Sequence, residues 1–453
     1  MDTSHWQRAR QSRDHRFDGL FFIAVKSTGI YCRPICPAPT AKEHNVEYFQ
    51  YAHSAALAGF RPCIRCRPDS APGSSAWQGT QTTALRAKAL IDSNFSQPQS
   101  CEQLAERLGI TSRYLRRLFD QHFGISVTQY RLFNQCHFAK KLLQETSLPV
   151  SEIAFAAGFN SIRRFNDAFL QQLHICPSKM RIKSKPNTSK ITLKLPFRPP
   201  YNWLALQQFL AKRLIAPIEW LSDISYGRSF KTEQYHGQFT ATIVKDKHYF
   251  SVEIDISDPR FLHPILANIR RVLDLDADTA LIEQHLKTHV HGAFKLTEGL
   301  RLPGIWSAFE AGMRAVLGQQ VSVTAAHNLV SQLVNELGEK DQARTYFPTP
   351  LAVASSELSF FKMPQARKNA LINLASFCQQ HPHCTDLDQW LALKGIGPWT
   401  VNYAKLRGQS QPDILLDGDL GVKKAQANAS AFESGACSPF RSYLTFQLWQ
   451  QLI

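Results

Sequence analysis

Four cysteines near the amino end carry the clearest chemical signal in this sequence. Three residues separate Cys32 from Cys36, two separate Cys63 from Cys66, and residues 37–62 lie between the two pairs. Two short C-x2–4-C pairs can place four sulfurs around one tetrahedral metal ion. Disulfides are the alternative, but each adjacent pair would close a very small ring. Nothing before residue 32 has the pattern of a secretory signal, so we expect a reducing, cytoplasmic location and a Zn2+ site.

A zinc ion held by four thiolates is formally dianionic, so its sulfurs stay deprotonated and electron-rich. Such a centre is either structural only, which is the commoner case, or it offers one thiolate as a nucleophile toward an alkyl group. Residues 22–36 (FIAVKSTGIYCRPIC) and 59–68 (GFRPCIRCRP) closely resemble the amino-terminal domain of the Ada adaptive-response family. The resemblance implies that Cys32 accepts a methyl group from a DNA phosphotriester. It also implies the zinc ligands Cys32, Cys36, Cys63 and Cys66.

Length and charge narrow the class of protein. A chain of 453 residues with 44% hydrophobic content is expected to form three or four domains. No apolar run approaches the ~20 residues that span a bilayer, so no membrane partner is expected. Residues 1–186 hold 25 Lys and Arg against 13 Asp and Glu, a net charge of +12, whereas the remainder holds 27 against 23, a net of +4. This asymmetry favours a nucleic acid as partner, with solubility alone as the alternative.

Residues 80–186 show helical periodicity broken by short turns. Helices are expected at 100–111 with a glycine turn, 112–122, 126–145, 150–157 and 161–172. A helix, a glycine turn and a basic helix thus occur twice, and in a helix-turn-helix the second helix enters a major groove. The two copies, with residues 176–181, resemble an AraC-type DNA-binding domain. The expected groove or phosphate contacts are Arg113, Arg116, Arg163 and Arg164, although exposed helical arginines are often merely solvated.

From residue 190 the pattern changes to strands. Residues 191–195, 237–244 and 249–256 alternate like half-buried strands, and the chain is expected to be helical after residue 259. The predicted fold class is therefore multidomain and mainly α. It combines a small zinc-bound α+β domain, a double helix-turn-helix, an α+β subdomain and an all-α domain. The predicted domain boundaries are 1–70, 80–186, 190–290 and 291–453.

Residues 393–400 (LKGIGPWT) are expected to join two helical segments by a hairpin. Gly395 and Gly397 permit a tight turn whose backbone N–H groups can approach a phosphate. Three aspartates follow at a spacing that resembles the helix-hairpin-helix DNA glycosylases. Together with residues 199–203, 300–304, 309–310, 315–322 and 441–443, the region from 195 to about 450 resembles the AlkA type of 3-methyladenine glycosylase. Nearly the whole chain thus resembles an Ada–AlkA fusion.

The resemblance implies a specific chemistry. Alkylation at N3 or N7 makes a purine cationic, and the oxocarbenium-like sugar left behind is best stabilised by a carboxylate. We expect Asp419 in this role, with Asp417 and Asp413 as alternatives. The implied base-binding residues are Trp399, Tyr403, Phe209, Gln319, Gln320 and Phe440, the last at a position where AlkA has tryptophan. An aromatic cleft suits a flipped cationic base, but Trp399 and Tyr403 are also spaced like an ordinary core pair.

The expected function combines base excision with regulation. The resemblance implies hydrolytic removal of alkylated purines (3-methyladenine and 7-methylguanine type) by a monofunctional DNA-3-methyladenine glycosylase II, because bifunctional relatives have lysine where Trp399 stands. It also implies stoichiometric methyl acceptance at Cys32 and transcription regulation by a monomer that binds alkylated and promoter double-stranded DNA and RNA polymerase. Methylation of Cys32 would remove one negative charge and strengthen DNA binding. The alternatives are a regulator with an inactive glycosylase-like half and a purely structural zinc site.

Overall fold

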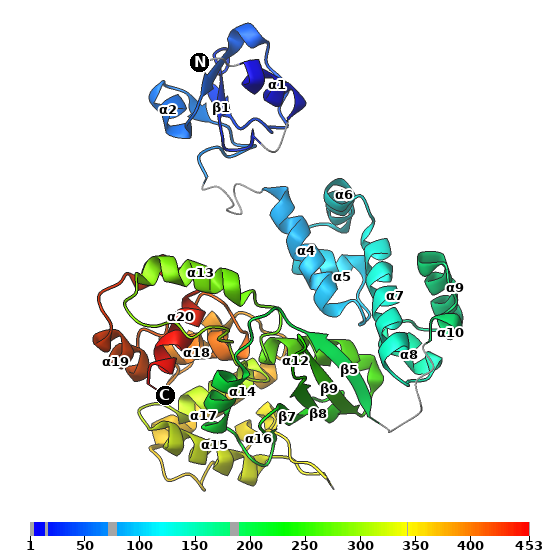
Figure 1. Cartoon of the computed structure of the whole chain (residues 1–453), viewed down its shortest axis with the longest axis vertical. Helices are drawn as coiled ribbons and strands as arrows, with labels where there is room; N and C mark the ends of the chain where they lie inside the picture. The colour runs from blue at the N-terminus through cyan, green and yellow to red at the C-terminus, as the bar shows by residue number, and fades with distance from the viewer. Residues whose placement is uncertain (1–3, 14–16, 71–78, 182–189, 342, 453) are drawn as a thin grey trace. The chain divides into compact units, whose positions relative to one another are not determined.

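The computed structural model describes residues 4–13, 17–70, 79–181, 190–341 and 343–452. The chain divides into two compact units, residues 1–134 and 135–453, and the boundary falls inside helix α7 (Val127–Glu145). Among the described residues, strands occur only before residue 63 and between residues 191 and 256, and the rest of the regular structure is helical (Figure 1). This confirms the mainly-α fold class. No described helix is long and apolar enough to cross a membrane.

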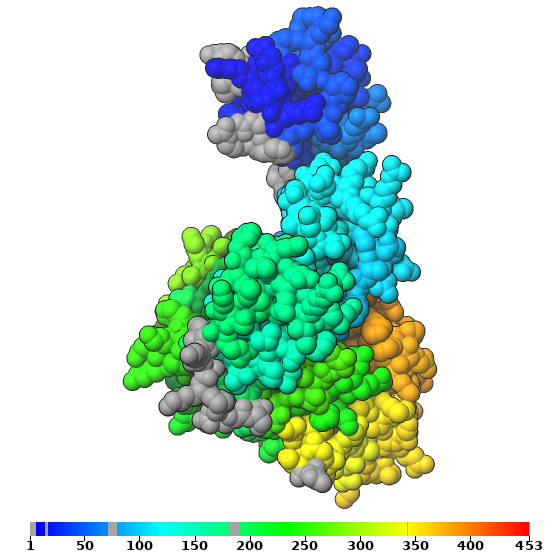
Figure 2. Space-filling model, turned by 90° about the vertical axis from the view of Figure 1, so that its right-hand side faces the viewer, coloured from blue at the N-terminus to red at the C-terminus, as the bar shows by residue number. Residues whose placement is uncertain are grey.

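A four-stranded sheet forms the core of the amino-terminal region. Its order is β3-β1-β2-β4, with β1 antiparallel to β2 and β3, and β2 parallel to β4. The strands are β1 (Phe22–Val25), β2 (Ile30–Cys32), β3 (Val46–Phe49) and β4 (Arg61–Pro62). Phe22 and Ala24 face Ala55 of α2 (Ala52–Leu57), whereas Phe21 and Ile23 face Ala9 of α1 (Ser4–Ser12). Side chains alternate along a strand, so the sheet has two apolar faces, and α2 covers one while α1 covers the other. The amino-terminal residues are drawn in blue in Figure 2.

Two helix-turn-helix repeats follow, as the periodicity predicted. The first pairs α5 (Cys101–Arg107) with α6 (Ser112–Phe123), and the second pairs α8 (Val150–Ala156) with α9 (Ile162–Leu173). In both, a glycine with positive φ follows the first helix: Gly109 at +69° and Gly158 at +85°. In both, a hydroxyl then caps the second helix, because Thr111 accepts from the Tyr114 N–H and Ser161 from the Arg164 N–H. The flanking helices are α4 (Thr80–Asn94), α7 and α10 (Pro177–Met180).

A five-stranded antiparallel sheet begins the remaining region, in the order β5-β9-β8-β7-β6. Its strands are β5 (Ile191–Pro196), β6 (Glu219–Leu221), β7 (Ser225–Lys231), β8 (His236–Ile243) and β9 (Tyr249–Ile256). The alternating segments β5, β8 and β9 were predicted, and β6 and β7 were not. Five consecutive residues of β7 are buried, including Arg228 and Ser229, so this strand lacks the alternation that marks a half-buried strand.

After residue 259 the chain is helical, as expected, whereas α11 (Trp203–Ala211), which lies between β5 and β6, was not predicted. The later α-helices are α12 (Leu262–Val272), α13 (Thr279–Val290), α14 (Ala308–Leu317), α15 (Val323–Leu337), α16 (Pro350–Ala354), α17 (Gln365–Gln380), α18 (Pro398–Gly408), α19 (Leu420–Asn428) and α20 (Arg441–Gln450). Short 3-10 helices lie at η3 (Pro259–Phe261), η4 (Leu387–Ala392) and η5 (Ser434–Cys437). Helix α14 is central, because it contacts α15, α17 and α18. At Gly408 a Cβ would lie 2.7 Å from the Ala308 Cα, so glycine permits this close approach of α18 and α14.

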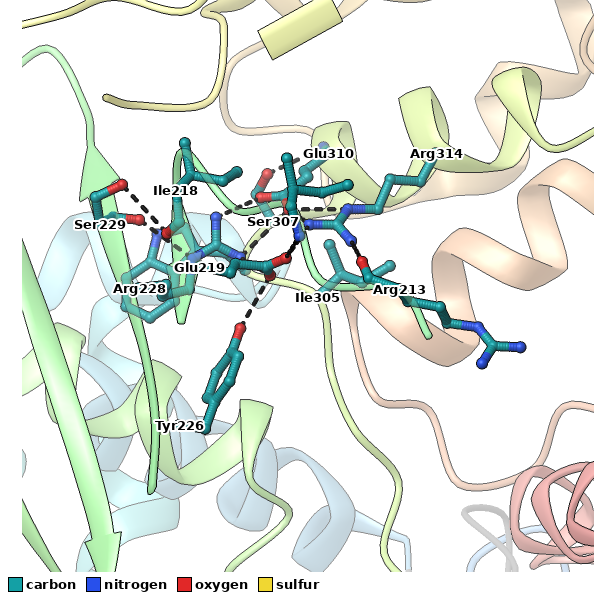
Figure 3. Close-up of polar contacts among 12 residues, drawn as sticks. Arg213, Ile218, Glu219, Tyr226, Arg228, Ser229, Ile305, Ser307, Glu310 and Arg314 are labelled. Carbon is teal, nitrogen blue, oxygen red and sulfur yellow. Dashed lines mark hydrogen bonds and ion pairs between the residues drawn. The ribbon is translucent and has the colours of Figure 1, made fainter. Parts of the chain in front are cut away.

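A buried ion cluster joins the sheet to α14; it consists of Glu219, Arg228, Glu310 and Arg314 (Figure 3). The Arg228 and Glu310 side chains are each 1% exposed and 2.8 Å apart. Arg314 lies 2.7 Å from Glu310 and 3.0 Å from Glu219. Although burial opposes it, Arg314 and Arg228 lower the pKa of Glu219 to about 2. Removing one member of such a buried pair typically costs about 3–5 kcal/mol, because an uncompensated charge remains.

The same cluster fixes the backbone that follows α11. Arg314 donates a hydrogen bond to the Arg213 carbonyl (3.3 Å), and Glu219 accepts one from the Ile215 N–H (3.0 Å). His327 of α15 contacts the Leu214 carbonyl at 2.7 Å. The main chain of residues 213–215 is therefore held from three elements, while the Arg213 side chain extends away from the cluster (Figure 3).

The Asp274 carboxyl makes the free energy of unfolding depend on pH. Burial raises its pKa to about 6, even though the Leu302 N–H and the Tyr443 hydroxyl donate to its carboxylate. Because the folded state binds this proton more tightly than the unfolded chain, the contribution to stability is complete below about pH 4 and is lost as the pH rises through about 6. As the pH rises from 5 to 8, wild type is expected to lose on the order of 1 kcal/mol of this stabilisation. Asp274→Asn carries an amide that does not titrate, so its stability relative to wild type is expected to rise by the same amount.

Urea unfolding of both proteins at the two pH values measures this change. Asp246→Asn is the matched control, because Asp246 is exposed and is not among the charges that shift the pKa of Asp274, so its difference from wild type is expected to stay constant. If the difference in free energy of unfolding between Asp274→Asn and wild type were the same at both pH values, the raised pKa of Asp274 would be wrong.

Candidate functional site

The metal centre is built by the parallel pairing of β2 with β4. Cys32 ends β2, Cys63 follows β4, and the Cys63 N–H donates to the Tyr31 carbonyl (3.0 Å), so the two cysteine pairs are brought side by side. The sulfurs of Cys32, Cys36, Cys63 and Cys66 all lie within 4.8 Å of one another. They are the one group of three or more potential ligands found among the described residues, and the other six cysteines do not join it.

The donor set fits a divalent cation. Four sulfurs within 4.8 Å of one another can all act as thiolates around one such ion. The Arg33 N–H also points at the Cys66 sulfur, 3.4 Å away, as expected for a sulfur that carries negative charge.

The four ligands differ in exposure. Cys36, Cys63 and Cys66 are buried, with 6–9% of their surface exposed, whereas Cys32 is half-buried. Among the nearby cations, Arg33 is buried and bonded to Asp18 and to the Cys66 carbonyl, so it holds the loop in place. Lys42, Arg61, Arg65 and Arg67, which stand within six residues of a cysteine ligand in the sequence, are exposed.

A second site is formed by aromatic rings from three helices. Trp399 and Tyr403 of α18 stack with centroids 5.4 Å apart. Phe209 of α11 lies 5.1 Å from Phe446 and 6.0 Å from Trp449, both on α20. We call these five residues the aromatic site. Trp399 and Tyr403 are half-buried, whereas Phe209 is 3% exposed, so Phe209 forms the buried floor of the site.

Asp419 lies at the edge of the aromatic site. Its Oδ1 accepts hydrogen bonds from the Val422 N–H (3.1 Å), which caps α19, and from the Trp449 indole N–H (2.9 Å). Among the described residues, Oδ2 has no hydrogen-bond partner, so one carboxylate oxygen is free. Asp413 is instead paired with Arg441 (2.7 Å), which lowers its pKa, and Asp417 is exposed. Trp449 was not assigned to the site from the sequence, although an indole can donate to a nearby carboxylate.

The glycine hairpin precedes α18, although its first helix is the 3-10 helix η4. Gly395 has φ +93°, and a Cβ there would lie 2.6 Å from the Ala370 Cβ, so only glycine fits. Gly397 has open space in front of it and no side chain caps α18, which leaves backbone N–H groups available to an anion. Gln319 donates to the Thr400 hydroxyl (3.1 Å), so it lies against the first turn of α18. Gln320 is exposed and has φ +56°.

The remaining predicted site residues are Phe440 and the four arginines of the helix-turn-helix repeats. Phe440 belongs to the apolar cluster that also contains Trp399 and Tyr403, and its ring meets that of His285 edge-on at 5.4 Å. Arg113 and Arg116 are exposed on α6, where Arg116 pairs with Glu102 (3.1 Å). Arg163 and Arg164 are exposed on α9. All four arginines therefore lie on the second helix of a repeat, which is where a groove contact requires them.

Two cations at the aromatic site were not predicted. The Arg213 guanidinium lies 3.9 Å from the centroid of the Phe209 ring, and that of Arg407 lies 4.8 Å from the same ring. Arg407 is 3% exposed and donates to the Pro303 carbonyl (2.6 Å) and the Tyr403 hydroxyl (3.3 Å). Arg213 stands four residues after Phe209, and Arg407 stands four residues after Tyr403, so this i,i+4 spacing could have indicated these two contacts. The contact of Arg407 with Phe209 has no such signal.

Three family models match the chain. The metal binding domain of Ada matches residues 5–69, a helix-turn-helix domain matches residues 104–183, and the AlkA N-terminal domain matches residues 192–307. A probable bifunctional transcriptional activator/DNA repair enzyme AlkA from Mycobacterium tuberculosis is 32% identical over 481 residues, covering 100% of this chain and 97% of that relative. The chain belongs to this family. The four-cysteine centre is accordingly its zinc site.

Two other relatives match the two halves of this family's architecture. DNA-3-methyladenine glycosylase 2 of Escherichia coli is 32% identical over 273 residues, covering 56% of this chain and 95% of the relative. The bifunctional transcriptional activator/DNA repair enzyme AdaA of Bacillus subtilis is 33% identical over 187 residues, covering 41% of this chain and 85% of the relative. These matches confirm the resemblance to an Ada–AlkA fusion that the motifs indicated.

Zinc content tests the metal centre. Cys63→Ala removes a buried ligand, and three remaining sulfurs hold zinc far more weakly than four. We expect wild type to retain about one zinc per chain after dialysis against a weak chelator, and Cys63→Ala to lose most of it, as measured by plasma mass spectrometry. Cys378→Ala, which removes a thiol outside the cluster, is expected to match wild type. Equal zinc in all three proteins would contradict the assignment.

Proposed function

We propose that this protein repairs alkylated DNA by hydrolytic base excision and couples this repair to sensing of DNA phosphotriesters. The observation that carries the excision half is the Asp419 carboxylate, which is fixed by two hydrogen bonds at the edge of the aromatic site with one oxygen free. An acidic group held rigidly beside half-buried aromatic faces suits a reaction in which positive charge develops on a sugar. The names of the relatives, a DNA repair enzyme and a 3-methyladenine glycosylase, support the same substrate class.

The proposed excision proceeds in a water-poor site after the nucleotide has left the duplex. The alkylated purine stacks against Trp399 and Tyr403, and the hairpin N–H groups bind a phosphate of the same strand. The bond between C1′ and the base breaks with its electron pair going to the base, so 3-methyladenine or 7-methylguanine leaves neutral. Asp419 Oδ2 stabilises the oxocarbenium-like sugar, and water then adds to C1′ and releases a proton. Trp399 offers no amine for a Schiff base, so the product is an intact strand with an abasic site.

The proposed sensor is Cys32. It is the one ligand of the four that is not fully buried, and exposed cations that can hold DNA phosphates stand near the ligands in the sequence. Bound zinc keeps the cysteines as thiolates. The Cys32 thiolate attacks the methyl carbon of a phosphotriester, the carbon–oxygen bond breaks, and the phosphodiester leaves with the electron pair. No step regenerates the thiolate, so the transfer is stoichiometric.

The proposed regulation follows from charge. Methylation converts one thiolate to a thioether and removes one negative charge from a surface that faces phosphates, which strengthens DNA binding. Arg113, Arg116, Arg163 and Arg164 then contact promoter DNA from the second helices of the two repeats. We further propose that the protein acts in the cytoplasm as a monomer and recruits RNA polymerase, in keeping with the transcriptional activators among its relatives.

Base release from methylated duplex DNA tests the excision half. We expect wild type to release free 3-methyladenine, and Asp419→Asn to lower the single-turnover rate by about 100-fold or more, because it removes the charge opposite the developing cation. The amide can still accept from Val422 and Trp449, so the fold is expected to persist. Asp417→Asn serves as the matched control and is expected to act like wild type. A wild-type chain that binds DNA but releases no base would instead support a regulator with an inactive glycosylase-like half.

Peptide mass mapping tests the sensor. After incubation with DNA that carries methyl phosphotriesters, we expect one methyl group per chain on the peptide that contains Cys32, because Cys32 is the least buried of the four ligands. Cys176, which is also half-buried but lies outside the zinc centre, is the internal control and is expected to stay unmodified. An unmodified Cys32 peptide would leave the zinc site with a structural role only.

A further inference from the structure

We infer that Arg213 is a specificity-determining residue that makes the aromatic site discriminate between cationic and neutral bases. This inference rests on the proposed excision function. Arg213 follows α11, and its main chain is anchored by Arg314 and, through the adjacent residues, by Glu219 and His327. Its side chain projects away from the buried ion cluster (Figure 3), and its guanidinium lies over the Phe209 ring at 3.9 Å.

The Arg213 guanidinium has more N–H donors than hydrogen-bond partners among the described residues. A guanidinium has five N–H donors. The hydrogen bond it makes among the described residues is to the Phe209 carbonyl, at the long distance of 3.3 Å. Burial and the neighbouring Arg407 lower the pKa of Arg213 to about 10, against the opposing effect of Tyr403 and Asp419. Arg213 is therefore charged at neutral pH, lies among Tyr403, Asp419 and Arg407, and has donors left for a ligand.

The position of Arg213 weakens the attraction of the aromatic site for a cationic base. A ring face attracts a cation by its quadrupole, but the Phe209 ring is already contacted by both Arg213 and Arg407. A cationic purine entering the site meets two fixed positive charges in a partly desolvated space, where charge repulsion is stronger than in water. A neutral base with ring or carbonyl acceptors meets no such repulsion and can accept a hydrogen bond from Arg213. Arg213 thus lowers the preference for cationic bases and raises that for neutral ones.

The test compares two lesions in one duplex sequence: 7-methylguanine, which is cationic, and hypoxanthine, which is neutral. Single-turnover release is measured for wild type and for Arg213→Gln, and the readout is the ratio of the two rates. A change in general DNA affinity affects both lesions and cancels in this ratio. We expect Arg213→Gln to raise the ratio of 7-methylguanine to hypoxanthine release by about tenfold or more.

Two further variants make the result specific. Arg213→Lys keeps the charge and loses the planar donor array, so its ratio is expected to stay much closer to wild type. Lys212→Gln removes a neighbouring exposed charge and is expected to leave the ratio unchanged. Thermal unfolding of each variant reports any loss of folding. An unchanged ratio in folded Arg213→Gln, or an equal shift in Lys212→Gln, would overturn the role of Arg213, whereas a wild-type chain that releases neither base would overturn the proposed excision itself.

Discussion

The buried ion cluster of Glu219, Arg228, Glu310 and Arg314 is the interaction on which the geometry of the carboxyl-terminal half depends. Two arginines and two glutamates removed from water are tolerable only when every charge has partners, and here each is paired within 3.4 Å. Because Arg228 comes from β7 and Glu310 from α14, the cluster fixes the sheet on the helical region. An apolar contact of the same area would hold the two together but would leave their relative rotation less defined.

That rigidity extends to the aromatic site. The Arg213 carbonyl accepts a hydrogen bond from Arg314 of the cluster, and Phe209 lies four residues earlier on α11. Buried charges, rather than solvent-exposed loops, therefore fix the position of Phe209, which forms the floor of the aromatic site. The same logic applies at the zinc centre, on a smaller scale. There the parallel pairing of β2 with β4 sets two cysteine turns side by side, and the buried Arg33 locks one turn to the other through the Cys66 carbonyl.

Short-range patterns made much of this fold predictable from the sequence. The cysteine pairs, the glycine turns at Gly109 and Gly158, and the alternation of β5, β8 and β9 are each determined by residues within about a dozen positions, so local chemistry is sufficient. The ion cluster was not predictable in this way. Glu310 and Arg228 are separated by 82 positions, and a buried arginine in β7 makes that strand look polar and solvated until its partner is known. Likewise, the pairing of Trp449 with Asp419 depends on how α20 returns to α19.

Asp419 illustrates how the bonds that cap a helix can also orient a carboxylate. Its Oδ1 is taken by the α19 N-cap and by Trp449, so these bonds orient the carboxylate while leaving Oδ2 free. A carboxylate without such partners would lose rotamer freedom on meeting a positive charge, whereas the Asp419 carboxylate has already lost it on folding. Trp449 also stacks on Phe209, and Arg213 lies over the same ring. The Asp419 carboxylate, the Phe209 ring and the Arg213 guanidinium are therefore connected by direct contacts. A change in any of the three is therefore felt by the other two.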